Sequence, residues 1–119
     1  MGYNKGNVYD ITADQGATFL RSISLKNSAK VPVSLAGFTG RMHIREKMTA
    51  IEIIEAQTTE NGRITIDEAA GTLLILIPPV DMEEIAAGVY VYDVEIESPE
   101  GEVGRVVSGT FTVRPEVTR

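Results

Sequence analysis

One segment decides the fold of this chain, and it has the sequence Val89-Tyr90-Val91-Tyr92-Asp93-Val94-Glu95-Ile96-Glu97. Apolar or aromatic side chains recur at every second position, which is the period of a half-buried β-strand and not of a helix. Short turns rich in glycine, asparagine, aspartate and proline separate this strand from seven further candidates, as in a sandwich or barrel. The predicted strands are Asn7–Thr12, Ala17–Lys26, Thr39–Lys47, Ile51–Thr58, Arg63–Asp67, Thr72–Pro78, Val89–Glu97 and Val103–Arg114.

Two predicted hairpins indicate that these strands share one core. The first pairs Asp67 with Thr72 across four residues, and the second pairs Ser98 with Val103. Both pairings gather apolar residues on a single face, as a half-buried antiparallel sheet requires. The facing pairs are Ile66 with Leu73 and Ile64 with Ile75, then Tyr90 with Phe111, Tyr92 with Gly109 and Val94 with Val107.

One helical turn interrupts the strands. Asp81-Met82-Glu83-Glu84 resembles a capping box, with Asp81 as the N-cap, and Gly88 ends the turn. Tyr90 follows at a strand start, which resembles the tyrosine corner of immunoglobulin-like sandwiches; an ordinary core tyrosine is the alternative. We therefore expect an all-β fold, an immunoglobulin-like antiparallel β-sandwich of seven to eight strands with one short helical turn. It forms a single domain over residues 1–119, with residues 1–6 and 115–119 as flexible arms.

Packing of the strands predicts both the core and a charged outer face. The strand Thr39–Lys47 is expected beside Val89–Glu97, with basic residues outward against acidic ones; each such pair contributes roughly 0.2–1 kcal/mol. This stripe serves strand pairing and solubility, or alternatively a binding role of its basic residues. The outward residues are Arg41, His43 and Arg45 opposite Asp93, Glu95 and Glu97. The expected core contains Phe19, Ile23, Leu25, Met42, Ile44, Ile64, Ile66, Leu73, Ile75, Tyr90, Tyr92, Val94 and Phe111, with Arg21 as the one polar residue in the inward set.

Composition excludes several classes of function. The chain has 119 residues, a net charge of −6, one histidine and no cysteine. The acidic balance disfavours nucleic acid and membrane surfaces as partners, and a thiolate metal site or disulfide is impossible. No phosphate-binding loop or nucleophile elbow occurs, and the glutamates fit an ordinary strand surface better than a glycosidase pair. We expect no catalytic, cofactor-binding or metal-binding residue, no enzyme activity and no signal peptide.

One strand has more apolar residues than a lone sandwich needs. In Thr72–Pro78, the inward set is Leu73, Ile75 and Ile77, so Leu74 and Leu76 point outward. Exposed leucines of this kind are covered either by another segment of the same chain, such as Asn7–Thr12 or Ile51–Thr58, or by another protein. Leu74 and Leu76 are therefore the candidate protein-interface residues.

Five segments carry a resemblance to a known family. They are Asp14-Gln15-Gly16-Ala17-Thr18-Phe19, Leu35-Ala36-Gly37-Phe38-Thr39-Gly40-Arg41-Met42-His43-Ile44-Arg45, Asn61-Gly62-Arg63-Ile64-Thr65-Ile66-Asp67, Gly88-Val89-Tyr90-Val91-Tyr92-Asp93-Val94-Glu95 and Gly109-Thr110-Phe111-Thr112-Val113-Arg114-Pro115-Glu116-Val117-Thr118. In this order they resemble small tailed-phage and prophage proteins, similar to the β-sandwich domains of phage collar and fibre-attachment proteins. The matching positions are turns and core, so the resemblance carries over no functional residue.

The resemblance implies a virion structural protein, made in the bacterial cytoplasm and present in several copies. Its partners would be other virion proteins and further copies of itself, in a tail collar, fibre adaptor, baseplate or capsid decoration. The alternative is an immunoglobulin-like binding module that recognises carbohydrate or a host surface. Against it, the chain has only seven aromatic residues and no tryptophan to stack on sugars. A third possibility, a small hydrolase, has no motif in the sequence to support it.

Overall fold

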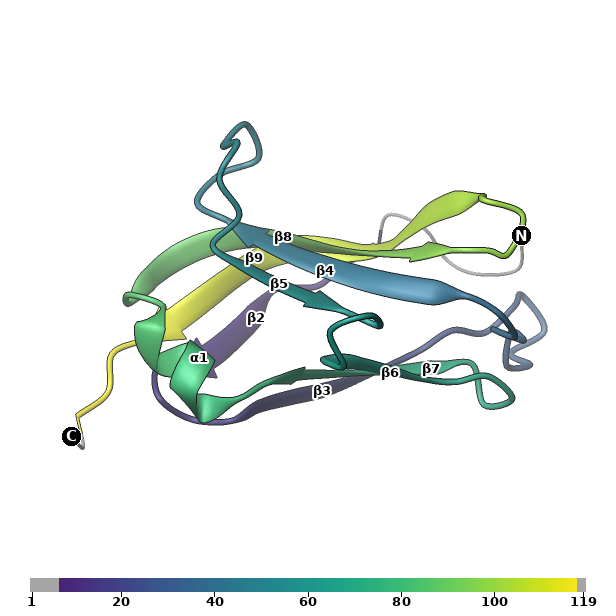
Figure 1. The fold of residues 1–119 in the computed structure, drawn as a ribbon, viewed down its shortest axis with the longest axis horizontal. Coiled ribbons are helices and arrows are strands. Elements are labelled where there is room, and N and C mark those ends of the chain that lie inside the picture. The colour runs from purple at the N-terminus through teal and green to yellow at the C-terminus, as the bar shows by residue number, and fades with distance from the viewer. Residues whose placement is uncertain (1–6, 118–119) are drawn as a thin grey trace.

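The computed structural model of the protein describes residues 7–117, which form two sheets packed face to face with one short helix at the end (Figure 1). This arrangement confirms the predicted β-sandwich. The strands are β1 (Asn7–Val8), β2 (Ile11–Asp14), β3 (Phe19–Ser24), β4 (Thr39–Arg45), β5 (Glu55–Thr58), β6 (Ile64–Asp67), β7 (Thr72–Ile77), β8 (Gly88–Glu97) and β9 (Val103–Arg114), and the helix is α1 (Pro79–Glu84).

The two sheets differ in size and in the direction of their strands. The large sheet has the order β1-β9-β8-β4-β5, with β2 also paired to β9, and the small sheet has the order β3-β7-β6. Strand β8 lies antiparallel to both β4 and β9, as predicted, whereas β1 and β2 run parallel to β9. The purely antiparallel arrangement that the sequence predicted is therefore wrong at this edge of the sandwich.

Hairpin register follows the prediction closely, with one shift. In the β6–β7 hairpin, Asp67 pairs with Thr72 as predicted, because the four-residue turn fixes the register. In the β8–β9 hairpin, the predicted partners hold from Tyr90 to Val94, but Glu97, not Ser98, pairs with Val103. A bulge accounts for the difference: the pairing shifts between Val94 and Glu95 and leaves Val106 as the extra residue of β9.

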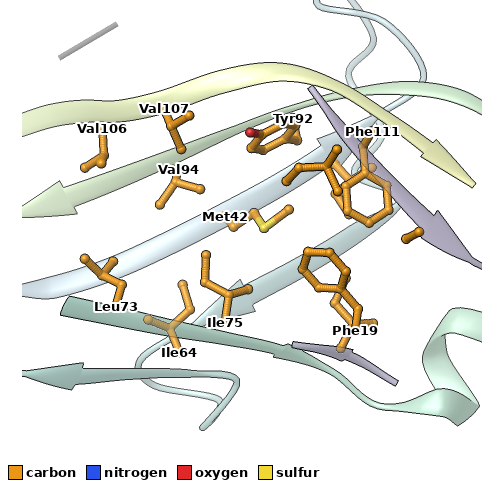
Figure 2. Close-up of a cluster of buried hydrophobic side chains, with 14 of the residues drawn as sticks. Phe19, Met42, Ile64, Leu73, Ile75, Tyr92, Val94, Val106, Val107 and Phe111 are labelled. Atoms are coloured by element: carbon orange, nitrogen blue, oxygen red, sulfur yellow. The ribbon is translucent and has the colours of Figure 1, made fainter. Parts of the chain in front are cut away.

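Side chains from both sheets meet in one core (Figure 2). The ring of Phe19, from β3, contacts Phe111 of β9 edge-to-face at a centroid distance of 5.3 Å, and Tyr92 of β8 lies 6.2 Å from Phe111. Every predicted core residue is buried except Ile23 and Ile66, which pack against the core while partly exposed. The sequence did not identify Leu35 or Met82 as core residues, although both are fully buried.

Helix α1 begins earlier than the capping box predicted. Its N-cap is Pro78, Pro79 is the first helical residue, and no side chain caps the helix. Proline is favoured at this position because its fixed φ suits the first turn and its missing N–H has no partner there. Asp81 therefore lies inside the first turn, where it forms an ion pair with Arg63 at 2.8 Å.

Tyr90 occupies the predicted corner. Its ring is 8% exposed, and its hydroxyl donates a 2.6 Å hydrogen bond to the carbonyl oxygen of Ala86, just after the helix. Burial, followed by the negative charge of Glu46, raises the pKa of Tyr90. The tyrosine therefore fastens the helical turn to the start of β8, which an ordinary core tyrosine would not do.

Several predicted strands are shorter or divided, among them Ala17–Lys26, which is a strand only over Phe19–Ser24. The predicted Asn7–Thr12 strand is interrupted at Tyr9 and Asp10, where the Tyr9 backbone lies so close to Gly109 that a Cβ at position 109 would be 2.5 Å from the Tyr9 carbonyl oxygen. The predicted Ile51–Thr58 strand begins only at Glu55. Of the predicted arms, residues 1–6 and 118–119 lie outside the described residues. In the described part of the C-terminal arm, the Glu116 backbone N–H donates to the side chain of Gln15.

Candidate interaction surfaces

The outer face of the large sheet carries the predicted charge stripe. Arg41 on β4 forms ion pairs with Glu95 at 3.1 Å and with Glu97 at 3.2 Å on the neighbouring β8. Partial burial acts to lower the pKa of Arg41, but hydrogen bonds to the two glutamates outweigh it and raise the pKa. His43 lies opposite Asp93 in the same register, half-buried between the charged neighbours. Of the basic residues in this stripe, Arg41 is thus engaged by carboxylates of the same sheet, whereas Arg45 binds backbone carbonyl oxygens of the following loop.

The outer face of the small sheet is different, because leucines occupy it. Leu74 is 42% exposed on β7, the middle strand, and Leu76 is half-buried two positions further on. Leu20 of β3 pairs directly with Leu76 and is 57% exposed. These three residues form a continuous apolar surface, which we name the outer leucine row. Its other neighbours in the register, Ser22 and Thr65, are small and exposed.

The two segments that the sequence offered as covers for this row lie elsewhere. Strands β1 and β2 pair with β9, and β5 pairs with β4, so all three belong to the large sheet. Among residues 7–117, therefore, no strand lies over the outer leucine row, and the outward direction predicted for Leu74 and Leu76 is correct. Leu20 was detectable as the outward neighbour of the buried Phe19, but its pairing with Leu76 depends on a long-range register.

A loop projects from the opposite side of the molecule. The connection from Glu46 to Ile54 joins β4 to β5 and rises away from both sheets (Figure 1); we name its part from Glu46 to Ile53 the projecting loop. Met48 is 82% exposed and Ile51 is 95% exposed. Arg45, at the end of β4, donates hydrogen bonds of 3.1 Å and 2.5 Å to the carbonyl oxygens of Ala50 and Ile51. The loop is therefore held in one conformation while its apolar side chains point into solvent.

A cleft of about 410 Å³ opens between the two sheets beside β1 and β3. Arg21, the polar residue of the inward set, lies at its mouth. The guanidinium donates a 2.8 Å hydrogen bond to the Tyr9 hydroxyl and lies 5.6 Å and 5.3 Å from the ring centres of Tyr9 and Phe19. The floor consists of core side chains, among them Ile75 and Val107. The cleft thus combines an apolar interior with a cationic rim.

Tyr92 holds one wall of this cleft in place. Its hydroxyl donates a 2.5 Å hydrogen bond to the carbonyl oxygen of Tyr9, next to Gly109. Burial, and then the neighbouring Tyr9, raise the pKa of Tyr92 to about 12. The Asp10 carboxylate accepts a hydrogen bond from the Thr110 backbone N–H and so fixes the same corner from outside. These bonds fix the position of Tyr9 and, through it, of Arg21.

Metal-ligating side chains form no site among the described residues. Within residues 7–117, no cluster of three or more histidine, aspartate or glutamate side chains has the geometry to hold a metal ion. A hollow near α1 is lined by Glu52, Glu55, Asp81 and Glu84, and burial raises the pKa of Glu55 there. Arg63 pairs with Asp81 beside it. The only helix in the described part of the chain is too short and polar to cross a membrane.

Comparisons with known proteins extend the description of the fold. No protein-family model and no curated protein matches the sequence. Among solved structures, the N-terminal domain of phage TP901-1 ORF48 is similar, with a TM-score of 0.61 at 12% identity over 94% of this chain and 92% of that one. CopC from Methylosinus trichosporium OB3b has a TM-score of 0.48 at 14% identity over 98% of this chain and 90% of that one. The resemblance to a phage protein thus holds for the fold.

Proposed function

We propose that this chain is a non-enzymatic structural protein of a phage virion that acts by associating with neighbouring virion proteins. The observation that carries the proposal is the outer leucine row, an apolar surface on a sheet that no described segment covers. The fold likeness to a phage protein domain over nearly the whole chain supports the setting. Collar, fibre adaptor, baseplate and capsid decoration are all assemblies in which such a domain would contact several neighbours, including copies of itself.

The leucine row has the character expected of an interface centre. Burying one leucine fully contributes about 1.5–3 kcal/mol relative to exposure, so partial burial of three would contribute a useful share of an association energy. A stable interface buries about 1,200–2,000 Å² in total, so the surrounding polar residues must take part. Ser22 and Thr65, beside the row, provide the small polar rim that such interfaces have.

The alternative, a carbohydrate-binding module, has less support from the described residues. Sugar platforms need exposed aromatic rings, yet Tyr90 and Tyr92 are in the core and the three phenylalanines are at least half-buried. Tyr9 is exposed, but its ring and hydroxyl are engaged by Arg21. Tyr3 lies outside the described residues.

Two measurements test the proposal. Mass spectrometry of purified particles from the phage or prophage that encodes the chain should detect it as a stoichiometric component; its absence from particles would contradict the virion role. Light scattering should then compare the wild type with a Leu74→Ser, Leu76→Ser double variant, alone and with proteins encoded beside it. We expect the variant to lose association while its melting temperature changes little. Unfolding of the variant would show instead that these leucines belong to the core.

A further inference from the structure

We propose that copies of this chain bind one another head to tail, with the projecting loop of one copy inserted at the mouth of the Arg21 cleft of the next. The inference rests on the proposed function, because it names a second copy as one of the virion partners. The loop and the cleft are different surfaces of the same molecule that approach each other at one point, where Met48 of the loop and Val8 of the cleft rim line one hollow. Such a contact is heterologous, so it builds rings when the rotation closes and filaments when it does not.

The loop has the shape and rigidity of an inserted element. Met48 and Ile51 are its most exposed apolar residues, at 82% and 95%. The hydrogen bonds from Arg45 to the backbone of Ala50 and Ile51, and a 3.0 Å bond from the Ala50 N–H to the Lys47 carbonyl oxygen, hold it before any partner arrives. A preorganised loop loses little conformational entropy on binding, which favours affinity.

The cleft offers the complementary surface. Val8 and Tyr9 at its rim are 75% and 51% exposed, and Ile23 is partly exposed along the β3 side. At about 410 Å³ it lies in the size range of roughly 300–1,000 Å³ found for binding pockets, which is ample for aliphatic side chains. Arginine and tyrosine are the residue types that most often anchor protein interfaces, and Arg21 and Tyr9 are already stacked at the mouth.

Charge selects the loop as the occupant of the cleft. Within residues 7–117, Arg21 makes one hydrogen bond and no ion pair, so most of its five N–H donors are left for a carboxylate. Glu52 is exposed on the loop next to Ile51 and also lacks an ion-pair partner among the described residues. A loop that carries an exposed isoleucine beside an unpaired carboxylate matches a cleft that has an apolar floor and an unpaired guanidinium at its rim.

A charge-reversal experiment tests this pairing. Sedimentation velocity at the highest soluble concentration should show the wild type self-associating, and Arg21→Glu and Glu52→Arg should each weaken self-association by about tenfold or more, because like charges then meet. An equimolar mixture of the two variants restores both contacts, since the reversed loop meets the reversed cleft and the native loop meets the native cleft. The Arg21→Glu, Glu52→Arg double variant should associate by itself for the same reason.

Controls separate this contact from the rest of the molecule. Lys26→Glu and Glu100→Arg change exposed charges elsewhere and should leave association unchanged. Ile51→Ser removes only a side chain that is 95% exposed, so it should weaken association without affecting folding. A wild type that stays monomeric at every concentration, or charge reversals that behave like their controls, would overturn the inference. If association is lost only when Leu74 and Leu76 are replaced, the proposed function stands and this contact is wrong.

Discussion

The two sheets present opposite kinds of outer face, although the same alternation of residues builds both. On the large sheet, Arg41 is held between Glu95 and Glu97, so the face is stabilised in water by its own ion pairs. On the small sheet, the corresponding outward positions carry Leu74 and Leu76, whose side chains form no hydrogen bonds or ion pairs with water or neighbours. Inner faces are alike and apolar. The comparison teaches that the outward residues alone decide whether the face of a sheet is charged or apolar.

Substitutions on the inner and outer faces of β7 should show the largest difference in stability between the two kinds of face. Ile75→Ala removes a side chain that is 2% exposed between the sheets, and we expect a loss of about 2–5 kcal/mol in the free energy of unfolding. Leu74→Ala, one position earlier on the outer face, should cost the isolated monomer less than roughly 1 kcal/mol. Urea unfolding at low protein concentration measures both. Equal losses would mean that Leu74 is packed within the monomer.

The inner face of the large sheet adds a pH dependence through Tyr92. Burial raises the pKa of Tyr92 to about 12, above an unfolded value of about 10, so the folded state holds this proton more tightly. The resulting stability is complete below about pH 10 and is lost as the pH rises towards about 12. We expect a loss of roughly 2–3 kcal/mol over this range in denaturant titrations. Tyr92→Phe should remove most of this loss, and Tyr90, whose pKa is also raised, should contribute the remainder.

The charged outer face should give the smallest effect. Arg41 and its two glutamates are about one-third exposed, so Arg41→Ala should cost only about 0.2–1 kcal/mol of unfolding free energy, and less at high salt. Self-association should not change. Comparing thermal unfolding and light scattering of this variant with the leucine variants separates the two faces. A large loss of association in Arg41→Ala would revive the binding role that the sequence left open for the basic residues.

Local patterns predicted the strands and faces because neighbouring residues determine them. The alternation in β8 gives its inward and outward sets, and the turn between Asp67 and Thr72 fixes a register that the structure reproduces. Outward leucines on β7 follow from the same rule. Long-range pairings could not be predicted from local patterns. The parallel pairing of β2 with β9 joins residues 100 positions apart, and no local signal encodes it.

One local pattern also misled. The alternating isoleucines at 51 and 53 favour a strand, but Arg45 binds the backbone here and holds it as a loop. Gln57 is fully buried on β5, and among the described residues its side-chain oxygen has no hydrogen-bond partner. In the candidate sites, the sequence found the outward leucines and flagged Arg21 as misplaced. It did not show that Arg21 meets Tyr9, because that contact joins two sheets.

The parallel pairing at the edge of the large sheet also has a mechanical consequence. Strands β1 and β2 begin the described chain, and β9 is its last strand. Both β1 and β2 lie beside β9 and run in the same direction as β9. A pull that separates these two ends along the strands therefore loads their bonds in shear, all together. Bonds from the Tyr9 N–H to Ser108 and from the Gln15 N–H to Arg114, with the Asp14–Arg114 ion pair, would share that load. These contacts at the edge of the sandwich therefore resist together a force that pulls the two ends of the chain apart.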